Sequence, residues 1–189
     1  MNIGIVGLGL IGGSMAKSTK NRTSHNVFGI DTDDETMMLS RLCGAIDTAL
    51  GSENIGSCDL LFLAVRPGAA IRWTEEHAGE ISKNTIVVDL CGVKRNVCRE
   101  ITRIAEEYGF TFIGGHPMAG KERGGFVSST DSLFAGASMI LTPDSDVDIN
   151  ALEELKNFFL DLGFAGITFS TPDEHDRIIA YTSQLAHIA

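Results

Sequence analysis

The sequence predicts an α/β fold in which a doubly wound, mostly parallel sheet is covered by helices on both faces. Short apolar runs alternate with longer amphipathic stretches along almost all of the 189 residues. Strands this apolar, each followed by a helical pattern, are typical of a parallel sheet that is buried on both sides. No repeat or low-complexity segment interrupts the alternation.

The expected elements follow one another along the chain. The predicted strands are Ile3–Val6, Val27–Ile30, Leu60–Val65, Thr85–Asp89, Phe110–Ile113, Ser138–Leu141 and Gly166–Phe169. The amphipathic stretches between them predict helices over Gly12–Lys20, Asp34–Cys43, Ala69–Ile81, Asn96–Tyr108 and Ile149–Leu162. Helical and strand periodicities thus succeed each other as a parallel sheet requires.

A further helix is expected near the end of the sequence. Thr171 is a candidate N-cap, Pro172 takes the first helical position, and Glu174 follows three residues after the cap. These residues together favour helix initiation. The segment that follows contains neither glycine nor another stop signal before Ala189. We therefore expect one domain over residues 1–169 and, over residues 170–189, the first helix of a truncated all-helical domain.

Composition excludes several classes of function. The net charge is −10 and the lysines and arginines are scattered singly, which argues against nucleic-acid and anionic-membrane partners. The uncharged stretch over residues 1–16 has no basic n-region, and no uncharged run reaches the roughly 18 residues that a membrane-spanning helix needs. Four cysteines without paired spacing predict reduced thiols in a cytoplasmic protein and no metal site.

The turn after the first predicted strand carries a dinucleotide-binding pattern. In the stretch IGIVGLGLIGGSMA, a G-x-G-x-x-G motif is formed by Gly7, Gly9 and Gly12, with Leu10 and Ile11 inside it. Such glycines permit a tight turn, close backbone approach to a pyrophosphate and close helix–strand packing. The helix N-terminus adds N–H donors. A Rossmann-like domain is therefore predicted.

The second predicted strand ends in an acidic residue suited to the same ligand. Asp31 lies nineteen positions after Gly12, near the place of a carboxylate that binds the adenosine ribose hydroxyls. The acidic neighbours Asp33 and Asp34, with no arginine nearby, favour NAD over NADP. Three further residues end the next strand: Val65, Arg66 and Pro67. They either pack against the cofactor or form an ordinary strand-to-helix turn.

Two basic residues follow strands at the carboxyl edge, where open α/β sheets bind ligands. His116, in IGGHPMAG, either accepts a proton near neutral pH or only hydrogen-bonds a turn. The small residues on both sides favour the first alternative, because they let a substrate approach the ring. Lys94, in DLCGVK, either holds a carboxylate as a point charge or is solvated at a helix start.

The last predicted helix presents a polar stripe. At 100° per residue, one narrow face carries Asp176, Ala180, Ser183 and His187. This stripe is either the wall of a pocket or a solvated face.

Several motifs together resemble a known family. GLGLIGGS, DLCGVK, GGHPMAG followed by LFAGASMILTP, and HDRIIAYTSQLAH occur in this order along the whole chain. The combination is similar to prephenate dehydrogenase, the NAD-dependent enzyme of tyrosine biosynthesis. The resemblance implies oxidative decarboxylation of prephenate to 4-hydroxyphenylpyruvate, with carbon dioxide and NADH as the other products, and a homodimer.

The resemblance also implies roles for individual residues. His116 matches the catalytic histidine that takes the proton from the ring C4 hydroxyl as hydride leaves C4 for the nicotinamide. Lys94 matches a basic position implicated in substrate binding or catalysis. Asp176 and His187 match recurrent positions in the first helix beyond the dinucleotide domain.

This sequence departs from the family pattern at three places. Many relatives carry serine where Gly92 stands, and such a serine would hydrogen-bond the hydroxyl or the histidine; a water or Cys91 is the expected substitute. Many also carry threonine at the position of Lys121, which alters the polar contacts beside the histidine. The family's helical dimerisation domain contributes an arginine that grips a substrate carboxylate, and this sequence ends before it.

Three interpretations of function remain open on the sequence. The first is prephenate dehydrogenase, or its variant that acts on arogenate, which differs from prephenate by an amino group in the side chain. The second is a fragment that binds NAD and turns nothing over. The third is another dehydrogenase or an imine reductase of the same fold, which does not account for GGHPMAG and TSQLAH together.

Overall fold

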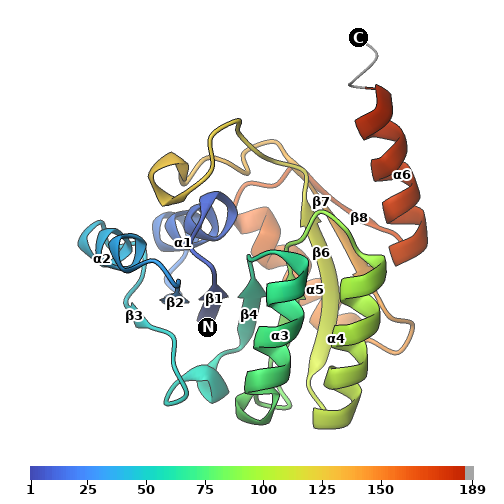
Figure 1. Ribbon diagram of the computed structural model, residues 1–189, viewed down its shortest axis with the longest axis horizontal. Helices are drawn as coiled ribbons and strands as arrows, with labels where there is room; N and C mark the ends of the chain where they lie inside the picture. Colours follow the sequence, from blue (N-terminus) through green and yellow to red (C-terminus); the bar gives the residue numbers. More distant parts are fainter. Residues whose placement is uncertain (186–189) are drawn as a thin grey trace.

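A single eight-stranded sheet runs through the protein, in the order β3-β2-β1-β4-β5-β6-β7-β8 (Figure 1). The structure is a computed structural model that describes residues 1–185, with side chains placed through Tyr181. Its strands are β1 (Asn2–Val6), β2 (Asn26–Ile30), β3 (Thr48–Ala49), β4 (Leu60–Leu63), β5 (Ile86–Asp89), β6 (Thr111–Pro117), β7 (Ser138–Pro143) and β8 (Gly166–Phe169). The order 3-2-1-4-5-6 of the first six is that of doubly wound dinucleotide-binding folds, so the predicted fold class is confirmed.

Strand pairing is parallel except at one place. β6 and β7 run antiparallel, with His116 opposite Ile140, and β8 returns parallel to β7. The two-residue strand β3 beside β2 was not predicted, because so short a run carries no periodicity. β6 also extends four residues beyond the predicted end at Ile113, so that the histidine lies inside the strand.

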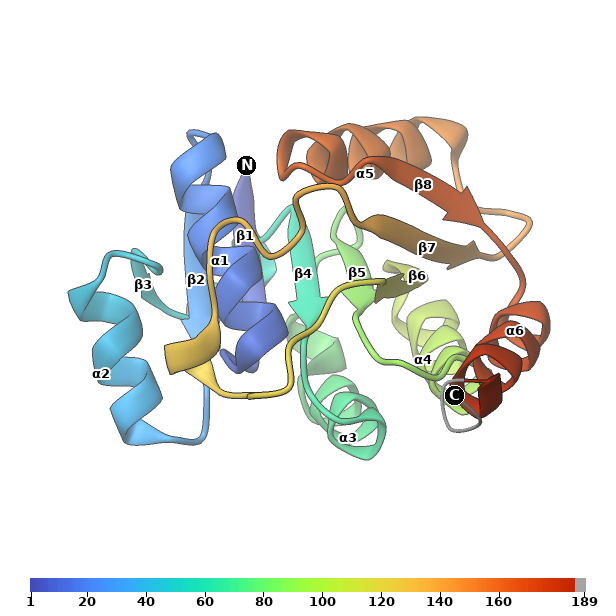
Figure 2. The ribbon, with the colours of Figure 1, turned by 90° about the horizontal axis from the view of Figure 1, so that it is seen from above.

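Helices cover both faces of the sheet. They are α1 (Leu10–Arg22), α2 (Asp34–Leu42), α3 (Pro67–His77), α4 (Arg95–Tyr108), α5 (Ile149–Asp161) and α6 (Pro172–Leu185), with short 3₁₀ turns η1 (Ile55–Ser57), η2 (Ala78–Glu80) and η3 (Phe126–Ser128). Apolar residues of α1, α2 and α5 join one buried cluster, and those of α3 and α4 join another. In the ribbon, α5 lies on one side of the sheet and α3 and α4 lie on the other (Figure 2). The sheet is therefore covered on both sides, as its apolar strands predict.

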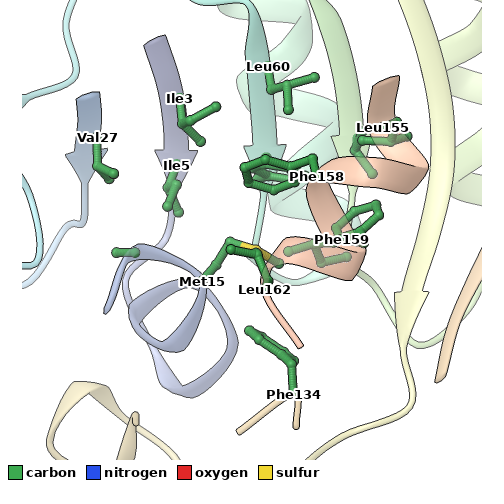
Figure 3. Close-up of a cluster of buried hydrophobic side chains, with 14 of the residues drawn as sticks. Ile3, Ile5, Met15, Val27, Leu60, Phe134, Leu155, Phe158, Phe159 and Leu162 are labelled. Carbon is green, nitrogen blue, oxygen red and sulfur yellow. The ribbon is translucent and has the colours of Figure 1, made fainter. Parts of the chain in front are cut away.

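Aromatic and aliphatic side chains fill the layer between the sheet and the helices α1 and α5. Ile3 and Ile5 of β1 lie in the same cluster as Met15 of α1 and the neighbouring rings of Phe158 and Phe159 of α5 (Figure 3). All five are at most 2% exposed. This packing fixes α1, and with it the glycine-rich turn, against the carboxyl edge of β1.

The long connection from β6 to β7 crosses the carboxyl edge of the sheet and passes over α1 before it returns (Figures 1 and 2). It is anchored by the buried rings of Phe126 and Phe134. Lys17 of α1 also donates a hydrogen bond to the carbonyl oxygen of Ser129, at 3.0 Å. The connection therefore borders the same edge as the glycine-rich turn.

The start of α6 follows its predicted capping pattern. The N–H of Glu174 donates to Oγ1 of Thr171 at 3.2 Å, and Oε2 of Glu174 accepts from the N–H of Thr171 at 3.4 Å, which is a capping box. Beyond β8 the helix packs beside α4 (Figure 2). The assignment of residues 170–189 to a second domain stays a prediction. Across residues 1–185, no helix has the length and apolar character to cross a membrane.

Two glycines of the first turn lead to opposite predictions for stability. A Cβ on Gly12 would lie 1.9 Å from the carbonyl oxygen of Gly7, whereas a Cβ on Gly9 would meet no atom of the described residues within 4 Å, apart from its chain neighbours. Because overpacking forces the backbone to shift, we expect Gly12→Ala to lower the free energy of unfolding by about 1–3 kcal/mol. Gly9→Ala is the matched control and should leave it nearly unchanged. Urea unfolding followed by circular dichroism measures both, and equal stability of the two variants would contradict the packing argument.

Candidate functional site

The glycine-rich turn leaves the N-terminus of α1 open to a ligand. Gly7 has φ +88°, and a Cβ there would lie 2.5 Å from Cγ1 of Val65, so only glycine fits. Gly9, the residue before α1, makes no side-chain cap, and a Cβ there would have no atom of the described part of the chain within 4 Å apart from its chain neighbours. Leu10 and Ile11 are the first two residues of α1. The first N–H groups of α1 are therefore available to an anion such as a phosphate.

Asp31 lies at the end of β2 beside this turn. Its Oδ2 accepts from the N–H of Leu8 at 2.7 Å, and its Oδ1 accepts from the N–H of Asp33 at 3.0 Å. A cavity of about 170 Å³ lies between Gly7, Asp31, Val65 and neighbouring apolar side chains. The structure thus brings the glycine motif, Asp31 and Val65 together, as the dinucleotide pattern predicts.

Of the three residues expected to contact the cofactor after β4, only Val65 lines the cavity beside Asp31. Arg66 is the exposed N-cap residue of α3 and Pro67 is the first residue of the helix. Neither lines the cavity beside Asp31, so their contact with a cofactor stays a prediction.

His116 occupies the carboxyl half of β6 rather than the turn that the sequence suggested. Its backbone pairs with β7 opposite Ile140, and its side chain is half-buried. Nε2 of the ring lies 3.7 Å from the position that a Cβ on Gly92 would occupy. The imidazole therefore faces the loop that follows β5, at the edge where the glycine motif also lies.

The glycine pair before His116 has a packing role in the structure, and its expected role of opening the ring to a substrate stays a prediction. A Cβ on Gly114 would lie 2.3 Å from Oγ1 of Thr142, and one on Gly115 would lie 2.7 Å from Cε of Met139. Larger residues at either position would collide with β7 side chains across the ladder. The glycines thus let β6 fit between its neighbours, and only indirectly place the histidine.

A second histidine, which the sequence reasoning missed, contacts the first. Nε2 of His175 lies 2.9 Å from Nδ1 of His116, and Nδ1 of His175 lies 2.8 Å from Oδ1 of Asp176. His175 is 1% exposed, although most of its neighbours at the start of α6 are exposed. A histidine next to the expected Asp176, at a strong helix start, is the signal that could have identified it.

Asp176 links α6 to α4. Its Oδ1 accepts from the N–H of Lys94 at 2.7 Å, and its Oδ2 accepts from the N–H of Arg95 at 3.1 Å. Partial burial acts to raise the pKa of Asp176, but the hydrogen bonds from Arg95, His175 and Lys94 outweigh it and lower the pKa overall. The carboxylate is thus an ionised cap on the first turn of α4.

Lys94 differs most from its expected place. Its side chain is fully buried, and Nζ forms an ion pair with Oδ2 of Asp89. Asp89, which the sequence reasoning also missed, accepts in addition from the N–H of Cys91 at 3.0 Å. The ammonium is therefore neither solvated nor exposed to a substrate carboxylate, and its influence on a ligand in this arrangement is electrostatic.

The remaining expected contacts are less central. The thiol of Cys91 donates to the carbonyl oxygen of Val65 at 3.3 Å, so the structure does not support it as the substitute for a serine at Gly92. Lys121 donates to the carbonyl oxygen of Ser128 at 3.0 Å, within its own connection. Ser183 lies within α6, where the structure describes only its backbone. His187 lies outside the described residues.

The described residues contain no cluster of three or more metal-ligating side chains. The four cysteines, all within that part of the chain, are free thiols.

Burial sets the protonation state of His116. Burial above all, followed by the electrostatic interactions with His175 and Lys94, lowers the pKa of His116 to about 4, although the carboxylate of Asp176 opposes the shift. An imidazole with this pKa is uncharged near neutral pH. It is available as a proton acceptor at the carboxyl edge of the sheet.

Comparison with known proteins assigns the family. The model of the nucleotide-binding domain of prephenate dehydrogenase matches residues 15–167. The chain belongs to this family. The match begins after the glycine motif, so the uncapped N-terminus of α1 is an observation that does not depend on it.

Individual relatives agree with the family and extend beyond this chain. Prephenate dehydrogenase of Bacillus subtilis (strain 168) is 31% identical over 189 residues, which are 97% of this chain and 50% of that protein. The crystal structure of Synechocystis arogenate dehydrogenase has a TM-score of 0.88 at 31% identity and is matched over 98% of this chain and 65% of its own. Prephenate dehydrogenase from Aquifex aeolicus, solved with hydroxyphenyl propionate and NAD⁺, has a TM-score of 0.83 at 26% identity and is matched over 100% of this chain and 70% of its own. The chain thus spans about half the length of the Bacillus relative.

The buried ion pair predicts a large effect of removing one charge. In this member of the prephenate dehydrogenase family, Lys94→Met leaves Asp89 buried without a counter-ion, so we expect the free energy of unfolding to fall by about 3–5 kcal/mol. The double variant Lys94→Met/Asp89→Asn removes both charges and should regain much of that loss. Urea unfolding measures all three proteins. A single variant as stable as the unmodified chain would mean that the pair carries no buried charge.

The low pKa of His116 predicts a pH dependence of stability. The folded state holds this ring neutral down to about pH 4, whereas an unfolded histidine binds a proton near 6.5. The unfolded state therefore binds more protons between these values, and stability contributed by the neutral ring is lost as the pH falls below about 6.5. We expect the unmodified chain to lose more stability than His116→Asn between about pH 7 and about pH 5.

Urea unfolding of both proteins at the two pH values measures the difference. His25, whose pKa is also lowered by burial and by the N-terminal charge, is present in both and cancels. Equal losses would show that His116 titrates alike in the folded and unfolded chains.

Proposed function

We propose that the chain carries out the NAD-dependent oxidative decarboxylation of prephenate to 4-hydroxyphenylpyruvate, as a prephenate dehydrogenase. The observation that carries this proposal is the half-buried imidazole of His116 at the carboxyl edge of β6, where burial lowers its pKa to about 4, in a chain of the prephenate dehydrogenase family. This chain spans only half of the Bacillus relative. The activity of the whole protein is therefore itself part of what we propose.

The residues present fit NAD. The empty space at Gly9 and the uncapped start of α1 suit a pyrophosphate, and the carboxylate of Asp31 suits ribose hydroxyls. A 2′-phosphate would meet the negative charge of Asp31 and its acidic neighbours, which disfavours NADP. When bound, NAD supplies the acceptor for a hydride.

His116 acts as the general base of the proposed reaction. Nε2 takes the proton of the C4 hydroxyl while the C4 hydrogen leaves as hydride, so that the C–O bond becomes a carbonyl. The bond from C1 to the carboxylate then breaks and releases carbon dioxide. Its electron pair makes the ring aromatic, and the phenolate oxygen takes the proton back. Lys94 does not contact the substrate in this scheme; its buried charge disfavours protonation of His116 before the substrate binds.

Arogenate is the second candidate substrate. The similarity to Synechocystis arogenate dehydrogenase favours it as much as the Bacillus relative favours prephenate. The two substrates differ by an amino group in the side chain, at a distance from C4, and would use the same base. We also propose, from the family alone, that the protein is cytoplasmic and forms a homodimer.

The decisive experiment is NADH formation by the chain with NAD and prephenate, run beside arogenate, beside NADP, and beside His116→Asn. We expect turnover with NAD that falls at least about 100-fold in His116→Asn, the lower range for loss of a general base. Absorbance at the NADH band measures the rate, and calorimetry measures NAD binding by both proteins. Normal turnover by His116→Asn would remove the histidine from the mechanism. NAD binding without turnover by the unmodified chain would identify it as a cofactor-binding part alone.

A further inference from the structure

The start of α6 and the end of β6 share a chain of three hydrogen-bonding groups. Asp176 contacts Nδ1 of His175 at 2.8 Å, and Nε2 of His175 contacts Nδ1 of His116 at 2.9 Å. The middle ring is 1% exposed, so water cannot replace either partner. A neutral imidazole has one N–H and one acceptor nitrogen, and the chain therefore has a direction.

The carboxylate end sets that direction. Both oxygens of Asp176 already accept backbone N–H groups of α4, from Lys94 at 2.7 Å and Arg95 at 3.1 Å. An ionised carboxylate can only accept, so the proton between Asp176 and His175 belongs on Nδ1 of His175. Nε2 of His175 is then an acceptor, and Nδ1 of His116 must donate to it.

We propose that His175 and Asp176 are positioning residues that hold His116 in the tautomer protonated at Nδ1, which leaves Nε2 as its proton acceptor. Nε2 is the atom that faces Gly92 at the carboxyl edge of the sheet. The tautomer follows from the contacts alone, whereas the use of Nε2 as a base rests on the proposed function. His175 contacts neither substrate nor cofactor in this proposal.

The opposite direction of the hydrogen-bond chain is unfavourable at the contact between His175 and Asp176. If His116 carried its proton on Nε2, its Nδ1 would accept from Nε2 of His175. Neutral His175 would then turn a lone pair toward the carboxylate of Asp176, and only a doubly protonated His175 would avoid this. That state would place a cation on a ring that is 1% exposed, and its counter-ion Asp176 already accepts two N–H groups of α4.

The arrangement also supports the proton transfer itself. When Nε2 of His116 takes the hydroxyl proton of a substrate, the ring becomes an imidazolium with N–H groups on both nitrogens. Nδ1–H keeps its hydrogen bond to His175, and the negative charge of Asp176 stabilises the new positive charge through that ring. No proton has to leave His175 during the step.

Nitrogen NMR of the chain tests the tautomers without any substrate. Long-range ¹H–¹⁵N spectra of the ¹⁵N-labelled protein, at a pH near neutral, distinguish Nδ1–H, Nε2–H and doubly protonated rings. His116→Asn identifies the signals of His116. We expect the Nδ1–H pattern for both His116 and His175. An Nε2–H pattern for His116, or a doubly protonated His175, would overturn the proposal.

Two substitutions of His175 sharpen the test. His175→Phe removes the acceptor and should move His116 toward the Nε2–H pattern, whereas His175→Gln offers a carbonyl oxygen and should keep the Nδ1–H pattern. His77→Gln, on α3, is a control that should change nothing at His116. An unchanged pattern in a folded His175→Phe would contradict the positioning role. If that variant fails to fold, the unmodified chain and His175→Gln still decide the tautomer.

Kinetics separates this inference from the proposed function. In a chain that forms NADH, His175→Phe should lower kcat at least about 10-fold with little change in KM, and His175→Gln should lower it less. A kcat unchanged in His175→Phe would contradict the positioning role. If no protein forms NADH while the spectra show the expected tautomers, the proposed function fails and the hydrogen-bond chain stands.

Discussion

The carboxylate of Asp176 on the first turn of α4 is the interaction on which the arrangement of the site depends. The first N–H groups of a helix lack partners inside it, and an anion there is also favoured by the helix dipole, by about 0.3–1 kcal/mol at a surface and more when partly buried. Because this anion comes from α6, the cap of one helix fixes the position of another. The same packing of α6 brings the ring of His175 into hydrogen-bond contact with His116. Together with the surface ion pair between Asp173 and Arg95, this side chain holds α6 beside α4, and through His175 it also orients the imidazole of His116.

Charge compensation around the site is divided between two acids. A buried ammonium is tolerated only with a close partner, and Asp89 supplies it for Lys94. Asp176 serves the histidine pair and the start of α4 instead. With its own counter-ion beside it, Lys94 still disfavours a positive charge on His116. The ring therefore stays neutral until a substrate proton arrives, while Asp176 remains available to stabilise the imidazolium that follows.

The sequence pattern located most elements because apolar strands and amphipathic helices have different periods. It placed His116 in a turn because glycines before it and Pro117 after it are turn signals. In the structure those glycines are required by Thr142 and Met139 on the neighbouring strand, a long-range reason that local patterns do not contain. The antiparallel direction of β7 is equally invisible in its composition.

The site was predicted less completely than the fold, for physical reasons. His175 was missed because it does not belong to the polar stripe that begins at Asp176, and its partner His116 lies 59 positions away in the sequence. Lys94 was expected to reach a ligand because a lysine at a helix start is normally solvated. Its burial depends on Asp89, whose role emerges only when β5 and the loop after it are in place.

The candidate site combines residues of β6 and α6, which lie on opposite sides of the predicted domain boundary before residue 170. β8 ends at Phe169, which makes the boundary before residue 170 natural for secondary structure. The hydrogen-bond chain crosses that boundary, because its base belongs to the sheet and its orienting groups belong to the helix. A buried polar group left without its partner costs about 1–3 kcal/mol, and separation would expose Nδ1 of His116, His175 and the first turn of α4 at once. The first turn of α6 therefore contributes to the stability of the sheet and of α4, which it contacts.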